Sequence, residues 1–162
     1  MKKLIWIVLL FSGMVTAQNI NQPFYGTWEA SINGNQIFKV ELYNNEEDRV
    51  RGHYHLYETD TAGNETLIYT SNVYLGFDLY LGPLIYGGSD GTELGAGIDD
   101  INHKDHKYNM LGGHLDMLIT SGNGEIGTTA TWKIKRKRGL RFIDDDRQFI
   151  IPTDLTLTKV SN

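Results

Sequence analysis

An all-β fold is predicted for this chain, built as a single antiparallel meander of about eight to nine strands that closes into a barrel. Three observations predict it. Apolar and polar residues alternate along most of the chain, which is typical of strands with one buried face. Short polar turns separate these stretches, and no stretch after residue 17 has the 3.6-residue apolar stripe of a helix. A β-sandwich fits the same pattern and stays open as an alternative, but closure removes exposed strand edges.

The first residues have the pattern of a secretory signal peptide. Met1-Lys2-Lys3 is basic, residues 4–15 are apolar but too few to span a bilayer, and Val15-Thr16-Ala17 fits a small-x-small cleavage site. We therefore expect residues 1–17 to be removed and residues 18–162 to form one secreted or periplasmic domain. The chain has no cysteine, which excludes disulfides, thiolate metal sites and the acylated cysteine of a lipoprotein. No transmembrane anchor is expected after cleavage.

The domain opens with a predicted β-hairpin. Residues 27–32 and 38–43 alternate, and Asn33-Gly34 lies between them. Asn-Gly between two alternating runs is a strong hairpin signal, because a type I′ turn needs a positive φ at both central residues. Five further ranges show alternation or short apolar runs bounded by turns, and we expect strands there: 50–57, 67–70, 73–81, 111–119 and 126–136. Residues 149–151 and 155–160 are the last two expected strands.

One segment interrupts this pattern. Residues 82–109 are polar and rich in glycine, and no strand is assigned to them. Loops of that length in a compact domain are often functional or mobile, and an insertion that contains strands is the other interpretation. If the segment is a loop, it is a candidate surface for contacts with another protein.

The entry to the first strand resembles that of a known family. Gly26-Thr27-Trp28 is similar to the opening of lipocalins, in which the tryptophan fills the closed end of the barrel and the glycine lets the backbone turn over it. Avidins are more distantly similar, through Gly52-His53-Tyr54 and Thr131-Trp132. The resemblance implies a lipocalin-like barrel and carries over only Gly26 and Trp28, both in a structural role. Lys159 on the last strand is not a clear match to the arginine that covers the lipocalin tryptophan.

The whole chain resembles an uncharacterised family of small secreted bacterial proteins. The signal peptide, Gly26-Thr27-Trp28 and the ending IPTDLTLTKV (151–160) carry this likeness. It implies a fold and an exported location, and no activity.

A non-catalytic binding or envelope-associated module is the function that these features favour. Its ligand would be a small apolar molecule inside the barrel. The inward-facing side chains expected to line that site, from the alternation alone, are Trp28, Phe38, Tyr54, Phe77 and Trp132. A small barrel filled by its own side chains gives the same pattern. No cofactor is indicated.

A metal-dependent or hydrolytic enzyme is the alternative function. His53 and His55 lie two residues apart, so on a strand both imidazoles project from one face, ~7 Å apart. His114 or Asp116 could supply a third ligand, and such a set suits zinc or copper. The alternative for the histidines is that they are polar residues on a solvated face.

The charge of the chain argues against nucleic acid as a partner. The chain has 15 lysines and arginines against 20 acidic residues, and removal of Lys2 and Lys3 makes it more acidic still, so it repels phosphate backbones. The run KIKRKRGLR (133–141) is the exception. It fits an anionic glycan or lipid head group, or a lysine-guarded strand edge.

Overall fold

The computed structural model describes residues 19–162 apart from 46, 77–78, 81, 102–109 and 138–146. These described residues form a short 3₁₀ helix, η1 (Gln22–Phe24), and a series of strands. The strands are β1 (Gly26–Ile32), β2 (Gln36–Asn44), β3 (Val50–Thr59), β4 (Glu65–Thr70), β5 (Tyr74–Gly76), β6 (Leu79–Tyr80), β7 (Ile85–Ser89), β8 (Glu93–Asp100), β9 (Leu111–Ser121), β10 (Thr129–Arg136) and β11 (Asp154–Ser161). No helix within these ranges is long and apolar enough for a membrane span.

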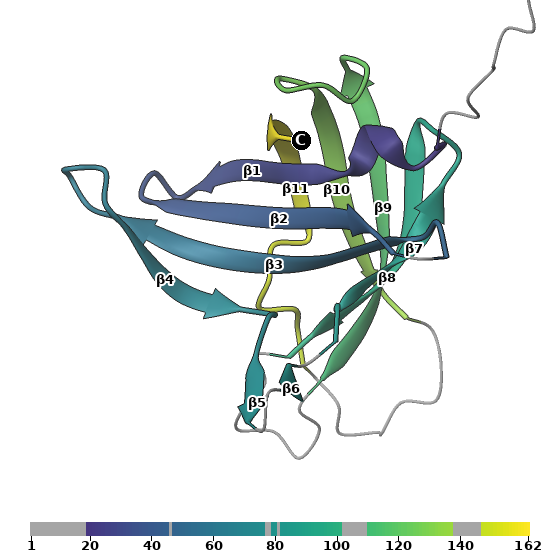
Figure 1. Cartoon of the computed structure of the whole chain (residues 1–162). Helices are drawn as coiled ribbons and strands as arrows, with labels where there is room; N and C mark the ends of the chain where they lie inside the picture. The colour runs from purple at the N-terminus through teal and green to yellow at the C-terminus, as the bar shows by residue number, and fades with distance from the viewer. Residues whose placement is uncertain (1–18, 46, 77–78, 81, 102–109, 138–146) are drawn as a thin grey trace, which may run out of the picture.

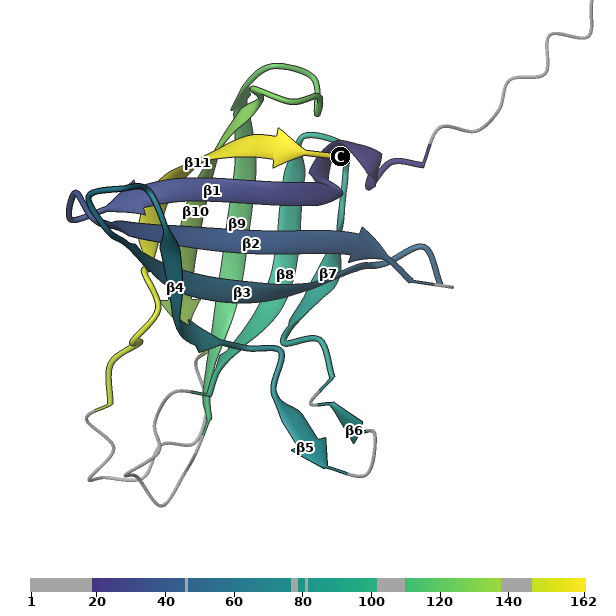
Figure 2. The ribbon, with the colours of Figure 1, turned by 60° about the vertical axis from the view of Figure 1, so that its left-hand side comes forward.

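Most of the strands close into one antiparallel barrel (Figures 1 and 2). Around the barrel the order is β2-β1-β11-β10-β9-β8-β7-β3, and β3 pairs with β2 to complete it. The strands therefore follow one another in sequence order, except for an excursion through β4, β5 and β6 between β3 and β7. This arrangement confirms the all-β, meander-like barrel. Because the barrel is one continuous sheet, the β-sandwich alternative is wrong.

The first hairpin forms where the sequence predicts it. β1 and β2 pair from Gly26↔Leu42 to Ile32↔Gln36. Asn33 and Gly34 have φ values of 51° and 79°, so both adopt the left-handed conformation that asparagine and glycine tolerate best. The loop includes Asn35 as a third residue.

The glycine-rich segment 82–109 is not a loop over most of its length, which corrects the prediction. β7 and β8 lie within it, and both are barrel strands. Leu94, Ala96 and Ile98 alternate inward, with glycine at two of the intervening outward positions. At Gly97 a side chain would overlap the ring of Tyr86, so glycine lets that ring lie against the strand. Residues 102–109 lie outside the described part of the chain.

The strand predicted at 73–81 is also wrong. Residues 74–76 and 79–80 form the separate two-stranded sheet of β5 and β6, outside the barrel. β5 and β6 lie outside the barrel because β3 pairs with two strands on the same side. It pairs with β7 through residues 50–52 and with β4 through residues 55–59. The chain leaves the barrel along β4 and returns at β7. Figure 2 shows β5 and β6 projecting beyond one end of the barrel.

Candidate functional site

The aromatic side chains expected to line a ligand site form the core of the barrel. Trp28, Phe38, Tyr54 and Trp132 are all fully buried. The Phe38 ring packs edge-on against Trp132, with centroids 5.6 Å apart, and stacks on Tyr54 at 6.2 Å. The structure therefore brings these four residues into one cluster. Phe77 lies outside the described residues.

The polar atoms of two of these rings are satisfied by the protein itself. The Tyr54 hydroxyl donates to the Asp99 carbonyl at 2.8 Å and accepts from the Ile101 amide at 3.3 Å. Burial raises the pKa of Tyr54, so the phenol stays neutral. The Trp132 indole donates to the Pro152 carbonyl at 3.0 Å. Hydrogen-bonded, fully buried rings in mutual contact are typical of a packed interior.

Trp28 lies near the start of β1 and is hydrogen-bonded to η1, which lies at one end of the barrel (Figures 1 and 2). Its indole nitrogen donates to the Phe24 carbonyl at 2.8 Å, and Phe24 is itself fully buried. The Lys159 ammonium lies 5.9 Å from the centre of the Trp28 ring. Lys159 was not predicted to be a clear counterpart of the arginine that covers the lipocalin tryptophan, yet its cation lies over this indole.

Gly26 allows the start of β1 to lie close to the end of β11. Its φ is +117°, and a side chain there would overlap the Ser161 carbonyl oxygen. A methyl group would also lie 2.9 Å from Lys159 Cε. The predicted structural role of Gly26 and Trp28 thus has a direct geometric reason.

The segment before β11 packs against the opposite end of the barrel. Ile151 is buried in the core, although residues 149–151 do not form the predicted strand. The buried Asp100 carboxylate accepts hydrogen bonds from the amides of Ile150, at 2.6 Å, and Ile151, at 3.3 Å. These bonds replace the strand ladder that the segment lacks. They hold Ile151 in place at the end of the barrel.

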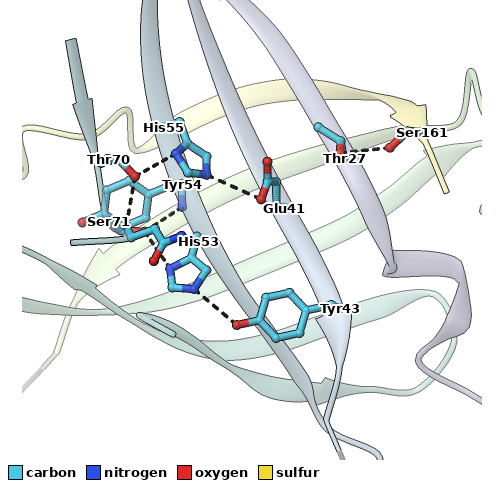
Figure 3. A network of polar contacts seen from close by, with 10 residues as sticks. Thr27, Glu41, Tyr43, His53, Tyr54, His55, Thr70, Ser71 and Ser161 are labelled. Carbon is cyan, nitrogen blue, oxygen red and sulfur yellow. Dashed lines mark hydrogen bonds and ion pairs between the residues drawn. The ribbon is translucent and has the colours of Figure 1, made fainter. Parts of the chain in front are cut away.

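His53 and His55 belong to a polar network on the outside of β2, β3 and β4 (Figure 3). Nδ1 of His55 lies 2.8 Å from the Thr70 hydroxyl, and its Nε2 lies 3.7 Å from a carboxylate oxygen of Glu41. Nδ1 of His53 lies 3.4 Å from the Ser71 hydroxyl.

The two histidines are less solvated than the sequence suggests. His55 is 9% exposed, because β4 covers it, and its Nε2 is buried without a hydrogen bond among the described residues. Burial lowers the pKa of both imidazoles, and the nearby His55 lowers that of His53 further. The solvated-face interpretation is wrong for His55. Neutral imidazoles here bridge β4 to β3.

His55 lies between a hydroxyl, that of Thr70, and a carboxylate, that of Glu41. Hydrolytic enzymes place a nucleophile, a base and an acid in this order. Two features oppose that use. The 3.7 Å separation between His55 and Glu41 exceeds hydrogen-bond reach, and the Thr70 oxygen already accepts from the Asn72 amide at 3.0 Å. The arrangement is better suited to fastening the end of β4 than to moving a proton.

The third metal ligand predicted from β9 does not join the histidine pair. β9 is separated from β3 by β8 and β7. His114 instead lies 3.0 Å from Asp116 on its own strand. In the part of the chain that the structure describes, no three His, Asp or Glu side chains gather closely enough to hold a metal ion.

The basic run at 133–141 is partly compensated by its neighbours. Lys135 forms an ion pair with Asp116 at 3.2 Å, and Lys137 donates to the Tyr86 hydroxyl at 2.9 Å. Both lysines lie on the outer face of the barrel, which leaves Lys133 as an exposed neighbour. Residues 138–141 lie outside the described residues. The described part of the run is a mixed-charge face rather than a purely basic one.

A cleft of about 510 Å³ opens outside the barrel, beside η1. We call it the basal cleft. It is lined by Gln22, Pro23, Tyr25, Asn123, Gly124, Glu125, Lys159 and Asn162. Two other surface clefts, of about 300 and 450 Å³, are also lined by described residues, and no core aromatic residue lines any of the three.

The basal cleft could not be found from the sequence. Its walls come from η1, the β9–β10 connection and the end of β11, which only the pairing of β1 with β11 brings together. The signals present in the sequence were Lys159 and the turn around Asn123-Gly124.

No family model, curated protein or solved structure matches this chain. The antiparallel barrel is compatible with a lipocalin-like barrel.

Proposed function

We propose that this protein is an exported, non-catalytic binding module whose ligand is bound outside the barrel. The single observation that carries the proposal is the mutual contact of the buried core rings. Phe38 contacts Tyr54 and Trp132 inside the barrel, and all three rings are fully buried. An apolar ligand at these residues would have to displace side chains that are already close-packed.

Contacts between the core and its flanking segments support the same conclusion. Phe24 of η1 and Ile151, which precedes β11, are both buried in the core, where Phe24 is hydrogen-bonded to Trp28 and Ile151 to Asp100. The basal cleft, by contrast, is open to solvent and within the usual size of small-molecule sites, ~300–1,000 Å³.

The location is supported by the leading residues 1–17, which have the three regions of a signal peptide. We further propose that the chain is one of the small secreted bacterial proteins that it resembles in Gly26-Thr27-Trp28 and in its last strand. An envelope-associated role is consistent with that location. The non-catalytic part rests on the histidine network, in which the Thr70 and Ser71 hydroxyls are used to hold β4.

A partner bound to the basic run is less well supported. An anionic glycan or lipid head group there would compete with Asp116 for Lys135. The contact surface proposed for residues 82–109 is also weakened, because β7 and β8 are built into the barrel.

Displacement of a hydrophobic dye tests the proposal. The exported protein is titrated with anilinonaphthalene sulfonate and with a fluorescent fatty acid, and the fluorescence of the core tryptophans is followed. We expect no saturable binding at micromolar concentrations. Stoichiometric binding that quenches Trp132 would contradict the proposal and favour an apolar ligand inside the barrel. A Trp132→Phe variant identifies the tryptophan that reports the binding.

A further inference from the structure

We propose that the basal cleft binds an uncharged carbohydrate. The inference rests on the proposed function and names the ligand class for it. The site is built from three distant parts of the chain, and its lining combines side-chain amides, a tyrosine and few charges. Amides can donate and accept at once, which suits the hydroxyl groups of a sugar.

Lys159 holds the two walls of the cleft in place. Its ammonium donates to the Gly124 carbonyl, and to the Pro23 carbonyl at 3.4 Å. Pro23 belongs to η1 and Gly124 to the β9–β10 connection, so one buried side chain joins both walls. The Thr128 hydroxyl also accepts from the Gly124 amide at 3.0 Å. A cleft with fixed walls loses little conformational entropy when it binds a ligand.

Two side-chain amides of the lining are available to a ligand, whereas the Asn123 amide oxygen accepts from the Glu125 backbone at 3.4 Å. Within the described residues, the side-chain amides of Gln22 and Asn162 make no hydrogen bond with the protein, and both residues are exposed. Tyr25 is held in place by its hydroxyl, which lies 3.2 Å from Asn44 Oδ1. Tyr25 is an aromatic residue of the lining, and an aromatic ring can offer a flat apolar surface to the C–H face of a sugar ring.

The charges of the cleft favour a neutral ligand. Two of the three donors of the Lys159 ammonium are used by carbonyl oxygens, and the ammonium also lies over the Trp28 ring. Desolvation also lowers the pKa of this ammonium. The exposed Glu125 carboxylate lies at the same cleft and repels an anion. A neutral sugar needs no free cation and is not repelled by Glu125.

Amide NMR titration of the exported protein tests the inference. The probes are glucose, galactose, N-acetylglucosamine, maltose, cellobiose and chitobiose at millimolar concentrations, with glucose 6-phosphate as the anionic comparison. We expect at least one neutral sugar to shift the signals of residues 22–25, 123–125 and 159–162 saturably. Signals of the histidine network should stay unchanged.

Variants make the test specific. Gln22→Ala and Tyr25→Leu should each raise the dissociation constant of the bound sugar at least ~10-fold, with an unchanged circular dichroism spectrum. Asn72→Ala removes an exposed amide outside the cleft and should leave the constant within about twofold. If Tyr25→Leu does not fold, Gln22→Ala alone decides.

Three results would overturn the inference. They are no saturable shift with any of these sugars, shifts outside the cleft only, or glucose 6-phosphate binding more than ~10-fold tighter than glucose. None of them affects the proposed function, which fails on dye binding inside the barrel. The two failures are therefore distinguishable.

Discussion

Truncation of Phe38 decides whether the barrel interior is packed or hollow. The ring is fully buried and lies between Trp132 and Tyr54, at centroid distances of 5.6 and 6.2 Å. Phe→Ala in a close-packed core costs about 3–5 kcal/mol, and each lost aromatic pair adds ~0.5–1.5 kcal/mol to what burial alone predicts. We therefore expect Phe38→Ala to lower the free energy of unfolding by about 4–5 kcal/mol.

Urea denaturation followed by tryptophan fluorescence measures this loss, and thermal unfolding should show a Tm lower by about 10–15 °C. The void left by the ring should also give the variant a weak binding site for benzene, which the parent protein lacks. The matched control is Leu118→Ala on the outside of β9, where the side chain is 44% exposed and the cost should stay below ~1 kcal/mol. A loss under ~1.5 kcal/mol for Phe38→Ala, with benzene bound equally by parent and variant, would refute the packed interior and restore the ligand-site interpretation.

The other predictions concern groups outside the aromatic core. Lys159→Met should destabilise the protein by about 1–3 kcal/mol in urea denaturation, because two backbone carbonyls lose their charged donor, whereas no loss would show that the ammonium is not needed. The pKa values of His53 and His55 are lower in the folded protein than in the unfolded chain. As the pH falls below ~6.5, the unfolded chain therefore takes up protons before the folded protein does. The free energy of unfolding should be constant above that pH and decrease below it. Urea denaturation between about pH 7.5 and 5 should show a smaller decrease for the double variant His53→Gln, His55→Gln, and an equal decrease would assign the effect to other groups. Chelation should leave Tm unchanged in protein purified without chelator, and a fall in Tm that His55→Ala abolishes would establish a metal at the histidine pair.

The features that the sequence predicts correctly are those encoded in neighbouring residues. Alternation over 27–32 and 38–43, with Asn33-Gly34 between them, determines both the hairpin and the inward direction of Phe38. The Gly26-x-Trp28 entry is local in the same way, because the glycine permits a positive φ at the first residue of a strand whose third residue is the buried Trp28.

The features that it misses depend on which strands meet. β8 was not predicted because its outward positions include Gly95 and Gly97. The polar half of the alternation is therefore absent, and the segment resembles a loop. The division of β3 between β4 and β7 is invisible for a different reason, since alternation gives the face of a strand and not its partner.

The candidate site was missed for the same physical reason. Three polar residues of its lining lie far apart in the sequence and belong to no motif: Gln22, Asn123 and Asn162. They line one cleft only through the register of β1 with β11 and through the ammonium of Lys159. Neither leaves a periodic signal in the sequence.

The pairing of β1 with β11 also dictates when folding can finish. Thr27 pairs with Ser161, and Trp28 with Lys159, although the partners are more than 100 residues apart in the sequence. Such distant contacts slow the search for the native state. Until the eighth barrel strand has left the ribosome, β1 keeps one unsatisfied edge and the indole lacks its cationic cover, so a nascent chain stays unfinished and prone to aggregate. Completion of the barrel therefore waits until β11 has been synthesised.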